Sequence, residues 1–142
     1  MGVLRPEEEA KVRELFAGLE RPVELVVALG PEETAMLGAR DVDFGGEATR
    51  VAEGLAELGE LVSVRVEEEP DGFPRFPSVS IRPDGEDAGV RYDGLPWGYE
   101  VASLIGGVLE AGRRESSLKP ESLEALAGLD RDLALDVFVT PT

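Results

Sequence analysis

The sequence predicts an α/β fold, a mixed four-stranded sheet flanked by helices on both faces. Val23 to Leu29 is an apolar run interrupted only by Glu24, which is typical of a central strand buried on both faces. A stretch of helical apolar spacing and an alternating run follow it. Two further alternating runs between Arg75 and Tyr92 flank Asp84-Gly85, which predicts a hairpin. A parallel half and an antiparallel half therefore share one sheet.

The elements around the central strand follow from spacing and from turn residues. Pro6 and the glutamates after it favour a helix start, and apolar residues at helical spacing extend that helix to Leu19. A second amphipathic helix is predicted over Glu47 to Leu58, and a strand over Leu61 to Val66. Between them, the pattern from Pro31 to Gly46 is looser, with a short helix opening at Pro31.

The hairpin combines an apolar side with a proline at its mouth. Val79 and Ile81 alternate with Ser80 and Arg82, so Val79 and Ile81 are expected to face the core. Pro77 cannot donate to a strand ladder. The sequence leaves two interpretations of the peptide bond before Pro77: a trans proline where the strand begins, or a cis proline in a turn.

The second half of the chain is predicted to hold a strong helix and then a separate segment. Val101 to Leu109 shows helical spacing, and its Gly106-Gly107 pair costs about 1 kcal/mol per glycine relative to alanine. Close packing of another backbone is the expected compensation. A short helix follows from Pro120 through Leu126, and then a strand over Leu133 to Val139. We expect a domain over residues 1–115, and over 116–142 a linker helix and an orphan strand.

Composition excludes several classes of function. Thirty acidic residues against fourteen basic ones give a formal charge of −16, which repels phosphate backbones and anionic lipid headgroups. Nucleic acid and membrane surfaces are therefore not expected as partners. The chain has no Cys and no His, so it carries no thiol chemistry, no imidazole base and no Cys/His zinc site of its own. We expect no cofactor and no enzymatic activity.

Other compositional features bear on the source and the compartment. Asn and Gln are also absent, which suits a thermophilic source because these residues are thermolabile. No apolar run reaches the length of a membrane span, and the N-terminus lacks a secretion-signal pattern. The expected location is the cytoplasm.

Two segments resemble a known family. Asp84 to Glu100 (DGEDAGVRYDGLPWGYE) and Val137 to Thr142 (VFVTPT) look like the N-terminal half of the glutaredoxin-like protein disulfide oxidoreductases of thermophiles. Those proteins carry two thioredoxin units in tandem. A more distant similarity is to the tandem thioredoxin-like domain of alkyl hydroperoxide reductase flavoprotein subunits. The resemblance spans nearly the whole chain, is loosest between Gly30 and Gly46, and implies a thioredoxin-like fold.

The resemblance also implies roles for particular residues. Pro77 would be the family's cis-proline facing the redox site, with Phe76 before it. The family's C-x-x-C pair, at the start of the helix after the first strand, is replaced here by Val42-Asp43-Phe44-Gly45, which has no thiol. The activity is therefore not carried over. In the family, the strand ending in Val-Thr-Pro-Thr leads into a second, Cys-containing unit, which we expect to be absent here.

The favoured hypothesis is a redox-inactive thioredoxin-fold module of a protein disulfide oxidoreductase-like protein. It would bind an extended peptide or a sister redox domain, such as a separate Cys-containing thioredoxin unit, by a form of strand addition. Phe44 and Trp97 are its candidate apolar anchors. The predicted contact surface consists of Arg75, Phe76, Pro77 and Ser78, with Val42, Asp43, Phe44 and Gly45 opposite.

Two alternatives remain. In the first, the chain has a structural or assembly role, and a homodimer forms through Leu133 to Val139 because an unpaired apolar strand is a template for association. In the second, Asp41 and Asp43 share a proton or bind a hard cation, as a different kind of enzyme would require. Such carboxylate pairs are common on loops and are usually only hydrated.

Overall fold

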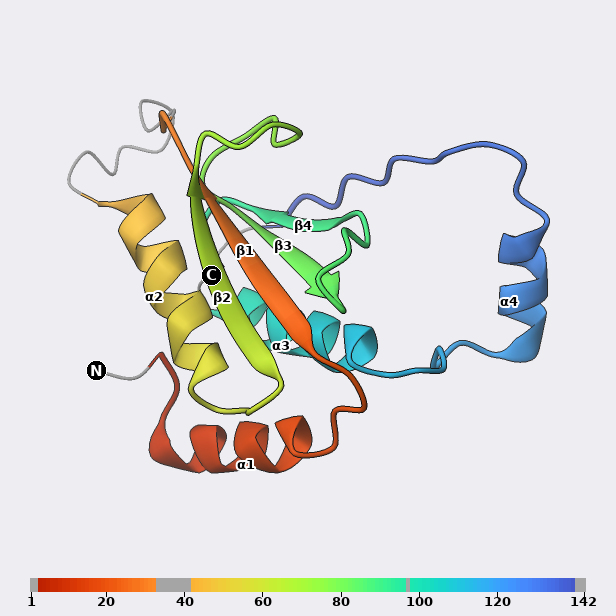
Figure 1. Cartoon of the computed structure of the whole chain (residues 1–142), viewed down its shortest axis with the longest axis horizontal. Helices are drawn as coiled ribbons and strands as arrows, with labels where there is room; N and C mark the ends of the chain where they lie inside the picture. The colour runs from red at the N-terminus through yellow and green to blue at the C-terminus, as the bar shows by residue number, and fades with distance from the viewer. Residues whose placement is uncertain (1–2, 33–41, 97, 140–142) are drawn as a thin grey trace.

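The computed structural model describes residues 3–32, 42–96 and 98–139 of the chain. Within these residues the four strands form one sheet in the order β2-β1-β3-β4 (Figure 1). β1 is parallel to β2 and antiparallel to β3, and β4 is antiparallel to β3. The predicted mixed four-stranded sheet is confirmed. The elements are α1 (Pro6–Phe16), β1 (Val23–Leu29), α2 (Phe44–Ala56), β2 (Val62–Glu68), β3 (Ser78–Pro83), β4 (Val90–Asp93), α3 (Tyr99–Ala111) and α4 (Pro120–Ala127).

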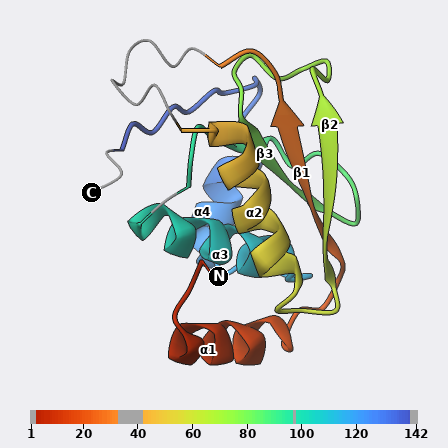
Figure 2. The same ribbon diagram turned by 90° about the vertical axis from the view of Figure 1, so that its left-hand side faces the viewer.

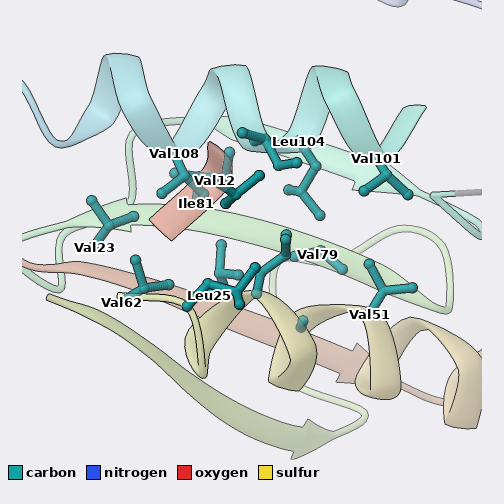
Figure 3. Close-up of a cluster of buried hydrophobic side chains, with 14 of the residues drawn as sticks. Val12, Val23, Leu25, Val51, Val62, Val79, Ile81, Val101, Leu104 and Val108 are labelled. Carbon is teal, nitrogen blue, oxygen red and sulfur yellow. The ribbon is translucent and has the colours of Figure 1, made fainter. Parts of the chain in front are cut away.

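The three helices that precede α4 all pack into one core. Figure 2 shows α2 and α3 together on one side of the strands, and α1 lies at the end of this layer. In Figure 3 Val101, Leu104 and Val108 of α3 face Val79 and Ile81 of β3. The core therefore lies between one face of the sheet and these helices. Its fully buried members include Val23, Leu25, Val27, Ala48, Val51, Ala52, Val79, Leu104 and Val108.

On the opposite face of the sheet a loop packs over β1, and none of the helices in the described ranges packs there, so the expectation of helices on both faces is not met by the described residues. Val26 and Ala28 of β1 point to this face and form a small cluster with Phe73, against which Phe76 packs. Phe73 and Phe76 belong to the connection between β2 and β3, residues 69–77. That connection is short, and its prolines and glycine disfavour a helix.

The hairpin keeps its predicted turn but is looser than predicted. Asp84 and Gly85 have φ angles of +53° and +77°, the left-handed region that a tight turn requires. β4 nevertheless begins only at Val90, which pairs with Ile81. The connection therefore runs from Asp84 to Gly89 instead of closing in two residues. Val79 and Ile81 face the core as predicted, with exposed fractions of 0% and 1%.

Asp87 holds this connection together. Its carboxylate accepts hydrogen bonds from the Gly89 backbone N–H and from Arg91 Nη2, both at 2.8 Å. The Gly89 N–H lowers the pKa of Asp87, and the charges of Arg91 and Arg82 lower it further. A carboxyl whose pKa is lowered by folding stabilises the folded state above its unfolded pKa, about 3.9, and loses that contribution as the pH falls through the lower folded value.

We therefore expect Asp87→Ala to destabilise the fold at pH 7, by at most about 1 kcal/mol because the side chain is partly exposed. Glu86→Ala, which removes a neighbouring exposed carboxylate, should have little effect. Urea unfolding of both variants and of the native chain at pH 7 and near pH 3 checks this. The cost of Asp87→Ala should shrink at the lower pH, and an equal cost at both would contradict the role assigned to the carboxylate.

The two adjacent glycines of α3 differ in their surroundings. A Cβ on Gly107 would lie 2.6 Å from Ile81 Cδ1 and 3.1 Å from Tyr92 Oη, whereas a Cβ on Gly106 would meet nothing within 4 Å. The expectation of another backbone packed at this pair is therefore corrected: the close contacts are with side chains of β3 and β4, at Gly107. It explains one glycine and leaves the other without a packing role.

Opposite effects on stability are expected from the same substitution at the two positions. Gly106→Ala should stabilise the fold by up to about 1 kcal/mol, because alanine has the higher helix propensity. Gly107→Ala should destabilise it by about 1–3 kcal/mol, because Ile81 and Tyr92 must move. Thermal unfolding of the two variants side by side is the measurement, and equal shifts of Tm in one direction would contradict this packing.

The residues after α3 leave the packed domain. α4 confirms the short helix predicted from Pro120, and it buries no residue. The strand predicted over Leu133 to Val139 is not formed: this segment pairs with none of the four strands, so its backbone groups have no ladder. Leu135, Val137 and Phe138 are 84–88% exposed. In Figure 1 the chain extends away from the sheet to α4 and then runs back toward the domain as a trace without helix or strand. The domain boundary at residue 115 remains a prediction.

None of the helices in the described ranges has the length and apolar character needed to span a membrane.

Candidate functional site

Three chain segments meet at one end of the sheet, where β1 ends and β3 begins. β1 ends at Leu29 and antiparallel β3 begins at Ser78, with Ala28 opposite Ser78, so these two strand ends lie together. α2 also begins here, and the loop before β3 lies at the same edge (Figure 1). We call the surface formed by Leu29–Glu32, Val42–Gly45 and Arg75–Ser78 the site edge.

The loop before β3 is anchored on both sides. A Cβ built on Gly30 would overlap the Phe76 ring, so Gly30 and Phe76 are in direct contact. The Phe76–Pro77 peptide bond is cis. The Pro77 carbonyl accepts a hydrogen bond of 2.8 Å from the Gly94 N–H, and Ser78 Oγ donates one of 2.8 Å to Asp93 Oδ1. These contacts fix the loop to the ends of β1 and β4.

Two carboxylates cap the start of α2. Asp43 Oδ1 accepts a hydrogen bond of 2.8 Å from the Gly46 N–H, and Glu32 Oε1 accepts one of 2.6 Å from the Gly45 N–H. In C-x-x-C proteins the positive end of a helix lowers a thiol pKa. Here two of the free N–H groups of the helix start, those of Gly45 and Gly46, are satisfied by carboxylate oxygens.

Glu32 is a site residue that sequence reasoning missed. The signal was a glutamate just after a buried strand and before a helix whose first N–H groups need acceptors. Because a stretch of sequence with no clear pattern separates Glu32 from Gly45, nothing in the spacing pointed to this pair. The contact draws the chain that leaves β1 onto the start of α2.

The structure brings the two predicted halves of the contact surface to the same edge. A Cβ on Gly45 would lie 2.9 Å from Leu29 Cδ2, while Gly30, the next residue, touches Phe76. Val42 and Phe44 are half-buried, and Gly45 is buried. The end of β1 thus separates the start of α2 from the Phe76 loop. Trp97, the other predicted anchor, lies outside the described residues.

Phe76 has unpaired backbone groups. Among the described residues, neither its N–H nor its carbonyl forms a hydrogen bond, although both of its neighbours in the loop are tied to Asp93 or Gly94. The residue is only half-buried. A donor and an acceptor at the end of a strand are what an added extended segment requires.

The cation hypothesis gains no support from the described residues. They contain no group of three or more Asp, Glu, His or Cys side chains that could hold a metal ion. Asp43 is engaged with the Gly46 N–H. Asp41, its proposed partner, lies outside the described residues.

No family model matches the sequence. The alkyl hydroperoxide reductase protein AhpF of Staphylococcus epidermidis is 24% identical over 140 residues, which cover 99% of this chain and 25% of that protein. The chain thus spans about a quarter of the length of the curated relatives it matches.

Two solved structures establish the fold. The NTD_N/C domain of alkylhydroperoxide reductase AhpF from Enterococcus faecalis has a TM-score of 0.75 and 19% identity, over 90% of this chain and 62% of that one. A protein disulfide oxidoreductase from Aeropyrum pernix has a TM-score of 0.70 and 21% identity, over 91% and 56%. This chain has a thioredoxin-like fold. These neighbours include both kinds of protein that the sequence resembles, and they confirm the thioredoxin-like fold that the resemblance implied.

Proposed function

We propose that this thioredoxin-like chain is a binding module of a redox-family protein. It binds an extended peptide segment at the site edge, either from a client or from a Cys-containing sister redox domain. The unpaired N–H and carbonyl of Phe76 carry this proposal. They lie in the loop just before β3, and an added extended segment would satisfy both.

The surroundings of Phe76 suit an extended segment. Its half-buried ring rests on Gly30, and Val42 and Phe44 offer further half-buried apolar surface across the end of β1. Alternate side chains of an extended segment could contact this surface while its backbone pairs with Phe76. Two backbone hydrogen bonds and a small apolar contact support weak binding, with a Kd on the order of 0.1–1 mM.

The bond to the partner is non-covalent in this proposal. The chain has no cysteine, and the helix start that carries a thiol in C-x-x-C proteins is capped by Glu32 and Asp43. Binding should therefore be the same with and without a reductant.

An NMR titration tests the proposal. The probe is an eight-residue peptide of alternating valine and glutamine, added to the ¹⁵N-labelled chain with and without dithiothreitol. We expect the amide signals of Arg75, Phe76 and Val42–Gly45 to shift in both buffers. Phe76→Ala should weaken binding at least fivefold, whereas Leu61→Ala, at the opposite end of the strands, should leave it unchanged. The proposal would be contradicted if no amide signal shifted at millimolar peptide, or if only signals at the opposite end of the strands shifted.

A second candidate is assembly through the C-terminal segment. Leu135, Val137 and Phe138 are almost fully exposed, and exposed apolar chain favours association. A homodimer through Leu133 to Val139 would give a dimer mass by light scattering, and deletion of residues 133–142 would convert it to a monomer. A monomer both before and after the deletion argues against this role.

A further inference from the structure

Concentrated negative charge flanks the site edge. β2 runs parallel to β1, so it ends at the same edge, where Glu68 is opposite Leu29. The Glu69 N–H donates a hydrogen bond of 2.7 Å to the Leu29 carbonyl, which fixes the start of the next loop there. Asp71 follows in that loop, which continues through Phe73 to Phe76. The glutamate run at the end of β2 therefore flanks the segment that holds Phe76.

These carboxylates are not neutralised by neighbours. Glu68, Glu69 and Asp71 are exposed, and within the described ranges their side chains form no ion pair or hydrogen bond. Two basic side chains lie close to this loop, and both have acidic partners elsewhere. Arg75 Nη1 is 3.4 Å from Asp93 Oδ2, and Arg91, whose guanidinium lies over the Phe73 ring, pairs with Asp87. An incoming segment therefore meets uncompensated negative charge beside the Phe76 backbone groups.

We propose that the segment bound at the site edge is basic, with lysine or arginine at alternate positions. This inference rests on the proposed function and names the chemistry of its partner. A strand paired with Phe76 directs alternate side chains to each face, and cationic ends can reach Glu68, Glu69 and Asp71 while the other side chains cover Phe76 and Phe44. The net charge of −16 also attracts such a segment from a distance.

The expected preference is moderate and sensitive to salt. Ion pairs between exposed side chains are weak, so two or three of them should make a basic peptide bind about three- to thirtyfold more tightly than a neutral one at low ionic strength. Most of that advantage should vanish near 0.5 M salt, where charges are screened over a few ångströms.

Three peptides that differ only in charge test the inference. Each alternates valine with lysine, glutamine or glutamate, and its Kd is measured by NMR titration of the full chain at low and high salt. The lysine peptide should bind most tightly and the glutamate peptide most weakly. Equal affinities, or a preference for glutamate, would overturn the inference and leave the proposed function standing. Failure of the lysine and glutamine peptides alike to shift the Phe76 amide overturns both.

A matched pair of variants separates local charge from net charge. Glu68→Gln/Glu69→Gln removes two carboxylates beside the site edge, and Glu20→Gln/Glu60→Gln removes two exposed carboxylates at the opposite end of the strands. The first variant should lower affinity for the lysine peptide about three- to tenfold and leave the glutamine peptide unaffected. The second should change it much less. Equal losses in the two variants would show that only net charge matters and would overturn the placement at the site edge.

Discussion

Replacing Leu104 with alanine is expected to lower the free energy of unfolding by about 2–5 kcal/mol. Leu104 lies in the middle of α3, is fully buried, and packs onto the sheet beside Ile81 (Figure 3). The substitution removes apolar contacts and leaves a cavity between the helix layer and the sheet. Urea unfolding followed by circular dichroism measures the loss.

The same substitution at Leu123 in α4 is the control. Leu123 is 41% exposed in a helix with no buried residue, so Leu123→Ala should change stability by no more than about 0.5 kcal/mol. A cost at Leu123 similar to that at Leu104 would mean that α4 is packed in solution, and it would contradict the separation of residues 113–139 from the core.

Gly30→Ala is the second change with a large expected effect, about 1–3 kcal/mol of destabilisation. The added Cβ would lie 2.7 Å from Phe76 Cε2 and closer still to Cδ2, so the ring must move. Because Phe76 packs against the small cluster of Val26, Ala28 and Phe73, that movement loosens the loop on the second face of the sheet. Binding at the site edge should weaken with it.

Gly54→Ala in α2 is the matched control. A Cβ there would meet only Val3 Cγ2, at an ordinary 3.7 Å, and alanine favours the helix, so this variant should be neutral or stabilised. Thermal unfolding of the two variants gives the sign of each effect, and the Phe76 ring signals in NMR report its position. An unchanged Tm and ring environment in Gly30→Ala would contradict the contact.

Periodicity predicted most of the sheet and its helices. Val23 to Leu29 is a central strand because it has strands on both sides and its residues are buried on both faces. α2 begins at Phe44, earlier than Glu47, because Asp43 caps glycines that have no apolar signature. α1 ends at Phe16. The prediction extended this helix to Leu19 because the apolar spacing continues past the last helical residue.

The errors arose where a structure depends on partners outside its own segment. Leu133 to Val139 has the composition of a strand, but a strand forms only beside another backbone. The second face of the sheet is covered by Phe73 and Phe76, which local patterns place in a loop and cannot place against Val26. The link from Glu32 to Gly45 likewise crosses a stretch without a pattern. The proximity of Arg75–Ser78 to Val42–Gly45 was predicted from the family resemblance and not from any local sequence pattern.

Protection of one backbone amide tests the central claim most directly. If an extended segment pairs with the loop before β3 at the site edge, hydrogen exchange at the Phe76 N–H should slow on saturation with the lysine–valine peptide, and its amide should show cross-strand contacts to the peptide. The effect should be equal in reducing and non-reducing buffer. A peptide that binds while exchange at Phe76 stays as fast as in the free chain would contradict strand addition at this loop.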